Sequence, residues 1–195
     1  MNIFILDKDP QKAAEYHCDK HVVKMILESA QMKSTAHWLH LLSANGKTLK
    51  DFKRIRDANQ WLLTNTDKSL HPPYSLTHVR HPCTIWVNST KENYDWHYQL
   101  LFHLCEEYTK RYKKIHKTAY HLKWFKKNYP LGMTGSKLED FAICMNDDYK
   151  INNDPILSYR EYYIKDKSRF AKWKYTKEPN WYAKGLMDEE CKKKI

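Results

Sequence analysis

The sequence predicts an all-α protein: a compact single-domain helical bundle of about five helices with long loops, and at most one short N-terminal strand. Apolar side chains recur every three or four residues along most of the chain, which is the spacing of one helix face. Glycine, which weakens helices, occurs only four times in 195 residues. A chain of this length makes one domain, so we expect residues 1–185 to form that domain and residues 186–195 to be a frayed tail.

Cap and turn signals place the individual elements. Residues 2–6 suit a short strand or an extended arm. Asp9-Pro10 and Asp154-Pro155 each start a helix, because Asp caps the first turn and Pro fits the first helical position. Asn45-Gly46 ends the first helix and Pro130 stops the fourth. The expected helices span residues 9–42, 48–63, 84 or 90 to 114, 118–128 and 154–173, with residues 64–83 and 130–153 irregular and residues 178–182 extended.

Charge is the strongest signal in the composition. Thirty-four Lys and Arg residues against 23 Asp and Glu residues leave a net charge of +11, with an isoelectric point near 9.3. Such an excess indicates a polyanionic partner, with nucleic acid favoured over an anionic membrane. A Lys-rich surface encoded by an AT-rich genome is the alternative explanation of the same balance.

Several classes of protein are excluded by features that the sequence lacks. No apolar run approaches the ~18 residues of a membrane helix, and the N-terminal apolar stretch is not expected to be a signal peptide because acids follow it directly. A Gly-rich phosphate loop is absent. The five cysteines are scattered without a CxxC pair, which indicates a reducing compartment. We therefore expect a cytoplasmic protein with no membrane partner; the pattern leaves the oligomeric state open.

A polar stripe follows one face of the first predicted helix. Its members are spaced by four, three, four, three and four residues, so they share a face: His17, His21, Lys24, Glu28, Gln31 and Thr35. Two histidines in line with Lys, Glu and Gln favour the floor of a catalytic site over a solvated face. Glu28, or Asp19 beside the stripe, would stabilise a cation or act as a base, Lys24 would be an amine nucleophile, and the histidines would move protons. An exposed face that happens to carry two histidines is the alternative.

A second group lies in the loop Thr77–Pro82. His78, Arg80 and His81 suit contacts with phosphates or base edges, and Pro82 stiffens the loop. The alternative is a basic surface loop that caps the next helix. We predict no cofactor. If a transition metal were bound, its ligands would be His17, His21, His78 and His81, with Glu28 as an oxygen ligand.

Two stretches of the chain combine basic and aromatic residues. Residues 110–127 hold eight Lys or Arg and no acid, and residues 165–184 form a second such stretch. Lys and Arg neutralise phosphates, and aromatic faces stack on unpaired bases, although most of these aromatics also suit a core. The predicted DNA-binding residues are Gln31, His78, Arg80, His81, Arg111, Lys113, Lys114, Trp124, Arg169 and Trp181.

Three short segments carry a resemblance to a known family. Ala44–Lys53, Ala14–Tyr16 and Pro179–Tyr182 are similar to segments of the small helical pyrimidine-dimer DNA glycosylases of the phage T4 endonuclease V type. The resemblance covers about a tenth of the chain and implies a helical DNA enzyme, or a phage relative that modifies bases. That family uses the α-amine of residue 2, here Asn2, and its catalytic Glu would fall near Cys18 or Asp19, where this chain has no Glu.

These observations together predict a phage-type DNA-acting enzyme that works on a pyrimidine base, as a glycosylase or lyase or as a base-modifying enzyme. It would flip the base into a pocket floored by the first helix. Arg80 and His81 would hold a phosphate, and Glu28 or Asp19 would stabilise the sugar cation. Two alternatives stay open: a non-catalytic basic nucleic-acid-binding protein, such as an inhibitor of a host system, and a metal-dependent enzyme acting on nucleotides.

Overall fold

The computed structural model describes residues 2–192, and this part of the chain is all-α, as predicted. It holds eight α-helices rather than about five. The helices are α1 (Pro10–Tyr16), α2 (Asp19–Ala44), α3 (Ile55–Asn65), α4 (Pro82–Ser89), α5 (Lys91–Tyr112), α6 (Leu122–Lys127), α7 (Pro155–Lys165) and α8 (Asn180–Lys192). Short 3-10 turns are η1 (Leu49–Asp51), η2 (Lys68–Leu70), η3 (Lys117–His121), η4 (Asp147–Tyr149) and η5 (Lys167–Arg169).

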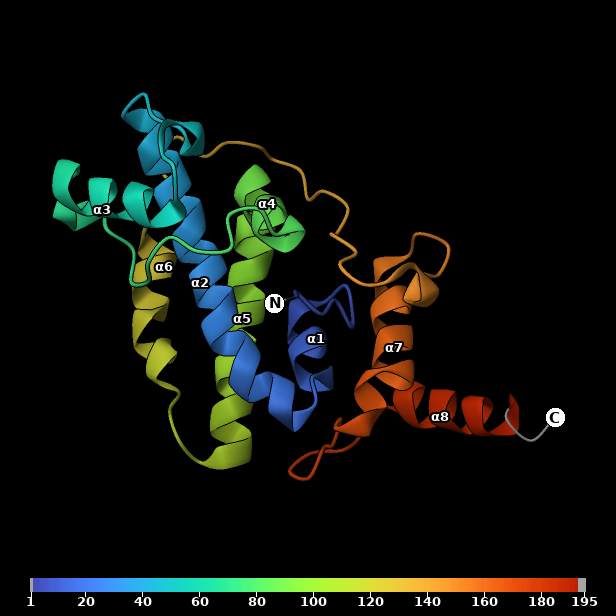
Figure 1. The fold of residues 1–195 in the computed structure, drawn as a ribbon. Helices are drawn as coiled ribbons and strands as arrows, with labels where there is room; N and C mark the ends of the chain where they lie inside the picture. Colours follow the sequence, from blue (N-terminus) through green and yellow to red (C-terminus); the bar gives the residue numbers. More distant parts are fainter. Residues whose placement is uncertain (1, 193–195) are drawn as a thin grey trace.

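The long helices α2 and α5 form the centre of the molecule and run antiparallel to each other (Figure 1). Helix α1 packs against α5, and α4 packs against both α2 and α5. Helices α7 and α8 lie together on the α1 side, whereas α3 crosses the far end of α2 (Figure 1). The main core lies among these helices, and a smaller apolar cluster around Trp38 and Leu62 joins α2 to α3.

The additional helices arise where a tertiary contact or a cap interrupts a predicted long helix. The helix expected over residues 9–42 breaks at His17 and Cys18, whose backbones are extended. The helix expected to begin at residue 84 or 90 is two helices, because Thr90 is extended and its hydroxyl caps α5 by accepting the Asn93 N–H. Apolar periodicity continues across both breaks, so the sequence pattern alone does not reveal them.

The remaining differences concern the ends of elements. The predicted helix over residues 48–63 is η1 followed by α3, and the predicted helix over residues 154–173 ends at Lys165 and continues as η5. Residues 178–182 were expected to be extended, but α8 begins at Asn180. Helix α8 also continues through residues 186–192, where a frayed tail was expected, and residues 193–195 lie outside the described part.

The N-terminal segment is an extended arm rather than a strand. Ile3, Phe4, Ile5 and Leu6 are at most 5% exposed and belong to the main core. The only bridge found in residues 2–192 joins Ile151 to Asp154, so the arm pairs with no strand there. Four apolar side chains in succession explain its position, because burying each one is worth about 1.5–3 kcal/mol.

Candidate functional site

The first two residues of the polar stripe lie in the core. The His17 side chain is fully buried, and its Nδ1 donates to the Ala13 carbonyl oxygen at 2.6 Å. His21 lies 2.5 Å from the Tyr163 hydroxyl and stacks on Phe4 with ring centroids 4.3 Å apart. Burial lowers the pKa of His17 to about 4 and that of His21 to about 2. Both rings are therefore neutral at pH 7, and they pack among aromatic side chains rather than lining a cleft.

Arg111 and Asp19 also stabilise the fold through contacts inside the protein. The guanidinium of Arg111 is 0% exposed, and its N–H groups donate to the carbonyl oxygens of Glu15 and His17 and to the carboxylates of Asp19 and Glu107 at 2.7–3.1 Å. These contacts use all five donors of the guanidinium. The other oxygen of Asp19 accepts the Lys174 N–H at 2.7 Å. Arg111 therefore closes the junction between α1 and α2 and has no donor left for a phosphate.

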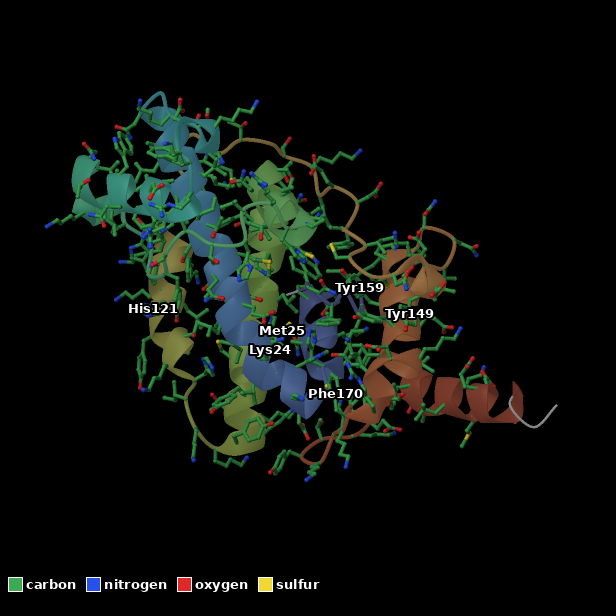
Figure 2. The ribbon with its side chains drawn as sticks, viewed as in Figure 1. Lys24, Met25, His121, Tyr149, Tyr159 and Phe170 are labelled. Atoms are coloured by element: carbon green, nitrogen blue, oxygen red, sulfur yellow. The ribbon has the colours of Figure 1, made fainter. Side chains whose placement is uncertain are left out.

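The middle of the stripe faces the predicted phosphate-binding loop. Lys24 Nζ lies 3.3 Å from Glu28 Oε1, with the lysine side chain 59% exposed and that of the glutamate 16% exposed. Figure 2 locates Lys24 on the N-terminal half of α2. Burial lowers the pKa of His81, and the charge of Glu28 opposes this by raising it. Two turns further along α2, Thr35 donates to the Thr77 carbonyl oxygen at 2.7 Å. Glu28 and His81 are therefore brought to one region, without His17 and His21.

A cleft of about 510 Å³ lies between the η1–α3 segment and the loop at residues 78–81. We call it the basic cleft; its lining residues are Leu49, Phe52, Lys53, Arg54, Ile55, His78, Val79, Arg80 and His81. The lining contains two histidines, three Lys or Arg residues and no acid. Arg54 is paired with Asp57 at 2.8 Å, whereas Lys53 and Arg80 are exposed. This composition suits a polyanion that reaches the loop from solvent.

The structure distributes the other predicted DNA-binding residues over separate places. Lys113, Lys114 and Arg169 are exposed, and Gln31 is half-buried on α2. The Trp124 ring packs on His37 with centroids 4.7 Å apart. These residues do not extend the basic cleft, because none of them lines it.

Trp181 lines a different pocket of about 480 Å³. The guanidinium carbon of Arg160 lies 5.2 Å from the Trp181 ring centroid, which is the geometry of a cation–π contact. This pocket also includes the acids Glu15 and Glu178. The carboxylates make it a poorer phosphate site than the basic cleft.

A cluster of metal-ligating side chains lies at the edge of the basic cleft. The donor atoms of His81, Cys83 and Cys144, which we call the cysteine–histidine cluster, all lie within 4.8 Å of one another. The two sulfur atoms are 3.4 Å apart, with Cys83 donating to Cys144. That hydrogen bond lowers the pKa of Cys144 to about 7. The predicted metal set of His17, His21, His78 and His81 forms no such group in residues 2–192; His81 alone belongs to one.

Hydrogen bonds from three segments position this cluster. The N–H of Ile3, in the N-terminal arm, donates to Cys83 Sγ at 3.3 Å. His81 Nδ1 accepts the Cys83 N–H at 3.2 Å and so caps α4. On the other side, the Tyr159 hydroxyl accepts the Cys144 N–H at 3.2 Å and donates to the Ala142 carbonyl oxygen at 2.9 Å. Figure 2 shows Tyr159 on α7, on the side of that helix turned toward the rest of the molecule.

Sequence reasoning missed both cysteines of the cluster. Cys83 is two residues from His81, a spacing that would have suggested a local pair of ligands, but no sequence signal connects them to Cys144, 61 residues away. It also missed Lys33, whose fully buried amine donates to the Tyr94 carbonyl oxygen at 3.0 Å. Burial lowers the pKa of Lys33 well below its usual value. Its position seven residues after Ile26, on the apolar face of the helix, was the available signal.

Comparison with known proteins adds no relative: no family model, no curated protein and no solved structure matches the chain. The resemblance to the pyrimidine-dimer glycosylases therefore stays a prediction from three short segments. Within residues 2–192, no helix combines the length and the apolar character needed to cross a bilayer.

Proposed function

We propose that this protein is a DNA-acting enzyme that binds a nucleic-acid strand in the basic cleft and acts on a pyrimidine base at its His81 end. One observation carries the proposal: His81 lines a cleft without acids and is also influenced by the charge of Glu28. A strand held by the cleft would meet the His81 imidazole, and the Glu28 carboxylate outside the lining acts on that imidazole through its charge. A carboxylate and an imidazole are the pair of groups that general acid–base catalysis uses. The proposed place of action is the cytoplasm.

The net charge of the chain supports the DNA-binding part of the proposal. A net charge of +11 attracts phosphates over the whole surface, and the exposed Lys53 and Arg80 provide direct contacts within the cleft. The apolar wall of Leu49, Phe52 and Val79 offers a surface for an unstacked base. Binding of this kind releases counterions, so its affinity falls steeply with salt concentration.

The proposed roles follow from position. Arg80 and Lys53 hold the phosphates, and Glu28 is the carboxylate that stabilises a sugar cation or accepts a proton. Lys24, exposed and next to Glu28, is the amine available for a lyase step. His17, His21 and Asp19 have no direct role in this proposal, because they pack the core and hold Arg111.

The test separates binding from chemistry. Fluorescence anisotropy with labelled single-stranded and duplex DNA, over a range of salt concentrations, should show that Arg80→Ala reduces the slope of log K against log salt by about 1. Lys184→Ala on α8 makes the same charge change outside the cleft and should leave affinity nearly unchanged. Equal effects of the two substitutions would remove the cleft from the proposal.

Chemistry is tested with DNA that carries pyrimidine dimers, uracil or modified thymine. Mass spectrometry should find a changed or released base with the unmodified protein, and Glu28→Gln should abolish this change while it retains DNA affinity. Borohydride trapping that depends on Lys24 would identify a lyase. If no base changes and nothing is trapped, the enzymatic part of the proposal fails.

A binding-only function is the second candidate. It is favoured by one observation: three of the five predicted catalytic residues, His17, Asp19 and His21, serve the packing of the α1–α2 junction. A non-catalytic protein predicts salt-dependent DNA binding that survives the double substitution Lys24→Ala and Glu28→Gln, with no base change in any substrate.

A further inference from the structure

We propose that the cysteine–histidine cluster binds one zinc ion through His81, Cys83 and Cys144, and that water occupies the fourth coordination position. The metal site itself is independent of DNA binding. Its use on a nucleic-acid base rests on the proposed function, because His81 also lines the basic cleft. Two thiolates and an imidazole with an open fourth position are a ligand set that proteins use for catalytic zinc.

The positions of the donor atoms already fit a tetrahedral site. With Zn–S near 2.3 Å and Zn–N near 2.0–2.1 Å, tetrahedral angles place two sulfurs about 3.8 Å apart and a sulfur and nitrogen about 3.6 Å apart. The sulfurs of Cys83 and Cys144 lie 3.4 Å apart, and the whole cluster lies within 4.8 Å. Small side-chain rotations are therefore enough to close the site around an ion, with no movement of helices.

The chemistry of the donors selects the metal. Thiolate and imidazole ligands favour zinc over magnesium or calcium, which prefer oxygen ligands. Once zinc has displaced the thiol proton, the bound Cys83 sulfur would still accept the Ile3 N–H, and it would lie at the second residue of α4, where the helix dipole favours negative charge. Zinc binding would release the protons of both thiols to solvent, including the one that now lies between the two sulfurs.

The surroundings of His81 also suit a ligand. Its Nδ1 accepts only the 3.2 Å contact from the Cys83 N–H, so a metal at Nδ1 would replace one weak cap hydrogen bond. The other ring nitrogen would keep its proton and could donate to an outer-shell acceptor, as ligating histidines usually do.

An ion has access to the cluster from the solvent side. Cys83 is buried, but His81 and Cys144 are both partly exposed. Cys144 lies in a loop outside the helices, where the Tyr159 hydroxyl and the Asn2 side chain hold its backbone. A zinc-bound water at this place would have a pKa near 7 and would lie next to the cleft, ready to act as a nucleophile on a bound base.

The first test measures metal in protein purified without a His tag under reducing conditions. Elemental analysis should find about one zinc per chain, and Co²⁺ in its place should give the visible bands of a tetrahedral site with a sulfur-to-metal charge-transfer band. Neither measurement needs a variant, so a folding defect cannot explain a negative result. If zinc is substoichiometric and Co²⁺ gives no thiolate band, the proposal is overturned.

Variants then assign the ligands. Cys83→Ser, Cys144→Ser and His81→Gln should each lower zinc affinity by more than the roughly 10- to 100-fold cost of losing an outer-shell partner. Cys191→Ser and His78→Gln are the matched controls, since Cys191 and His78 are exposed and lie outside the cluster; they should keep full affinity. Circular dichroism checks that each variant is folded. Zinc that is retained by the Cys144→Ser variant contradicts the proposed ligand set.

Two further outcomes distinguish the zinc site from a disulfide and from the proposed DNA binding. A Cys83–Cys144 disulfide that persists under reducing conditions, found by mass spectrometry, would overturn the metal site. DNA affinity measured with a chelator present should be unchanged, because the cleft binds phosphates without zinc. If the protein binds zinc but not DNA, the proposed function fails and the zinc site still stands.

Discussion

Arg111 and Asp19 lie 3.1 Å apart in a contact that joins residues 92 positions apart in the sequence. The guanidinium is fully buried, and it also donates to the carbonyl oxygens of Glu15 and His17 at the end of α1. The chain therefore turns between α1 and α2 at the place where α5 supplies these hydrogen bonds. That turn directs His17 and His21 into the core and leaves Glu28 facing the loop at residues 78–81.

Replacing Arg111 should destabilise the whole fold. Arg111→Met leaves the partly buried Asp19 carboxylate without its cation and leaves the buried Glu107 carboxylate with the exposed Lys110 as its remaining cation. Removing one member of a buried ion pair costs about 3–5 kcal/mol. Urea unfolding followed by circular dichroism measures the change. Lys113→Ala, on an exposed neighbour, should stay within about 0.5 kcal/mol of the parent protein. Weaker DNA binding by Arg111→Met without a loss of stability would contradict the structural role.

Acid should weaken the protein because two buried histidines stay neutral in the folded chain. The pKa of His17 is about 4 and that of His21 about 2, both lowered by burial from 6.5. The unfolded chain takes up these protons below pH 6.5 while the folded chain does not, so their stabilising effect is complete above 6.5. It is lost as the pH falls toward 4, by up to about 1.4 kcal/mol per histidine and pH unit.

Substitution of one histidine tests this pH dependence. The free energy of unfolding of His21→Gln, measured by urea titration at a series of pH values, should be lower at neutral pH and should fall less steeply between pH 6.5 and about 4 than that of the parent protein. His78→Gln, on an exposed residue, should keep the parent slope. Identical slopes for all three proteins would show that the buried rings do not govern acid stability.

Loss of the Tyr159 hydroxyl should free the loop that holds Cys144. Tyr159→Phe removes the group that accepts the Cys144 N–H and donates to the Ala142 carbonyl oxygen. We expect destabilisation of about 1–3 kcal/mol and faster alkylation of Cys144, measured by mass spectrometry after timed exposure to iodoacetamide. Tyr149→Phe, on η4, is the control and should leave the alkylation rate unchanged. An unaltered rate in Tyr159→Phe would mean that the loop is held by other contacts.

Local sequence signals predicted the all-α class of the fold well and the ends of the individual helices poorly. Asp9-Pro10 and Asp154-Pro155 do start α1 and α7, with each Asp side chain accepting N–H groups of the first turn. Such caps depend on residues next to each other in the chain. The breaks at His17–Cys18 and Thr90 are missed because an apolar stripe continues through them, and the contact that decides the first break comes from α5.

The candidate site shows the same division. The loop at residues 78–81 was recognised from its histidines and arginine, and it does line the basic cleft. The polar stripe was predicted to be one surface, but helical spacing does not show what covers each residue. Phe4 and Tyr163 cover His21, whereas the charge of Glu28 acts on His81. Cys144 had no local signal at all, because its partners come from other segments.

The sequence by itself determined the helical periodicity, the proline and aspartate caps and the surplus of cationic side chains. Each of these depends on neighbours along the chain or on the total charge. Packing between distant segments set the rest. It decided which histidines are buried and neutral, which arginine is buried, and which two cysteines lie next to a histidine. Burial and desolvation depend on what covers a side chain, and here α5, α7 and the N-terminal arm provide that cover.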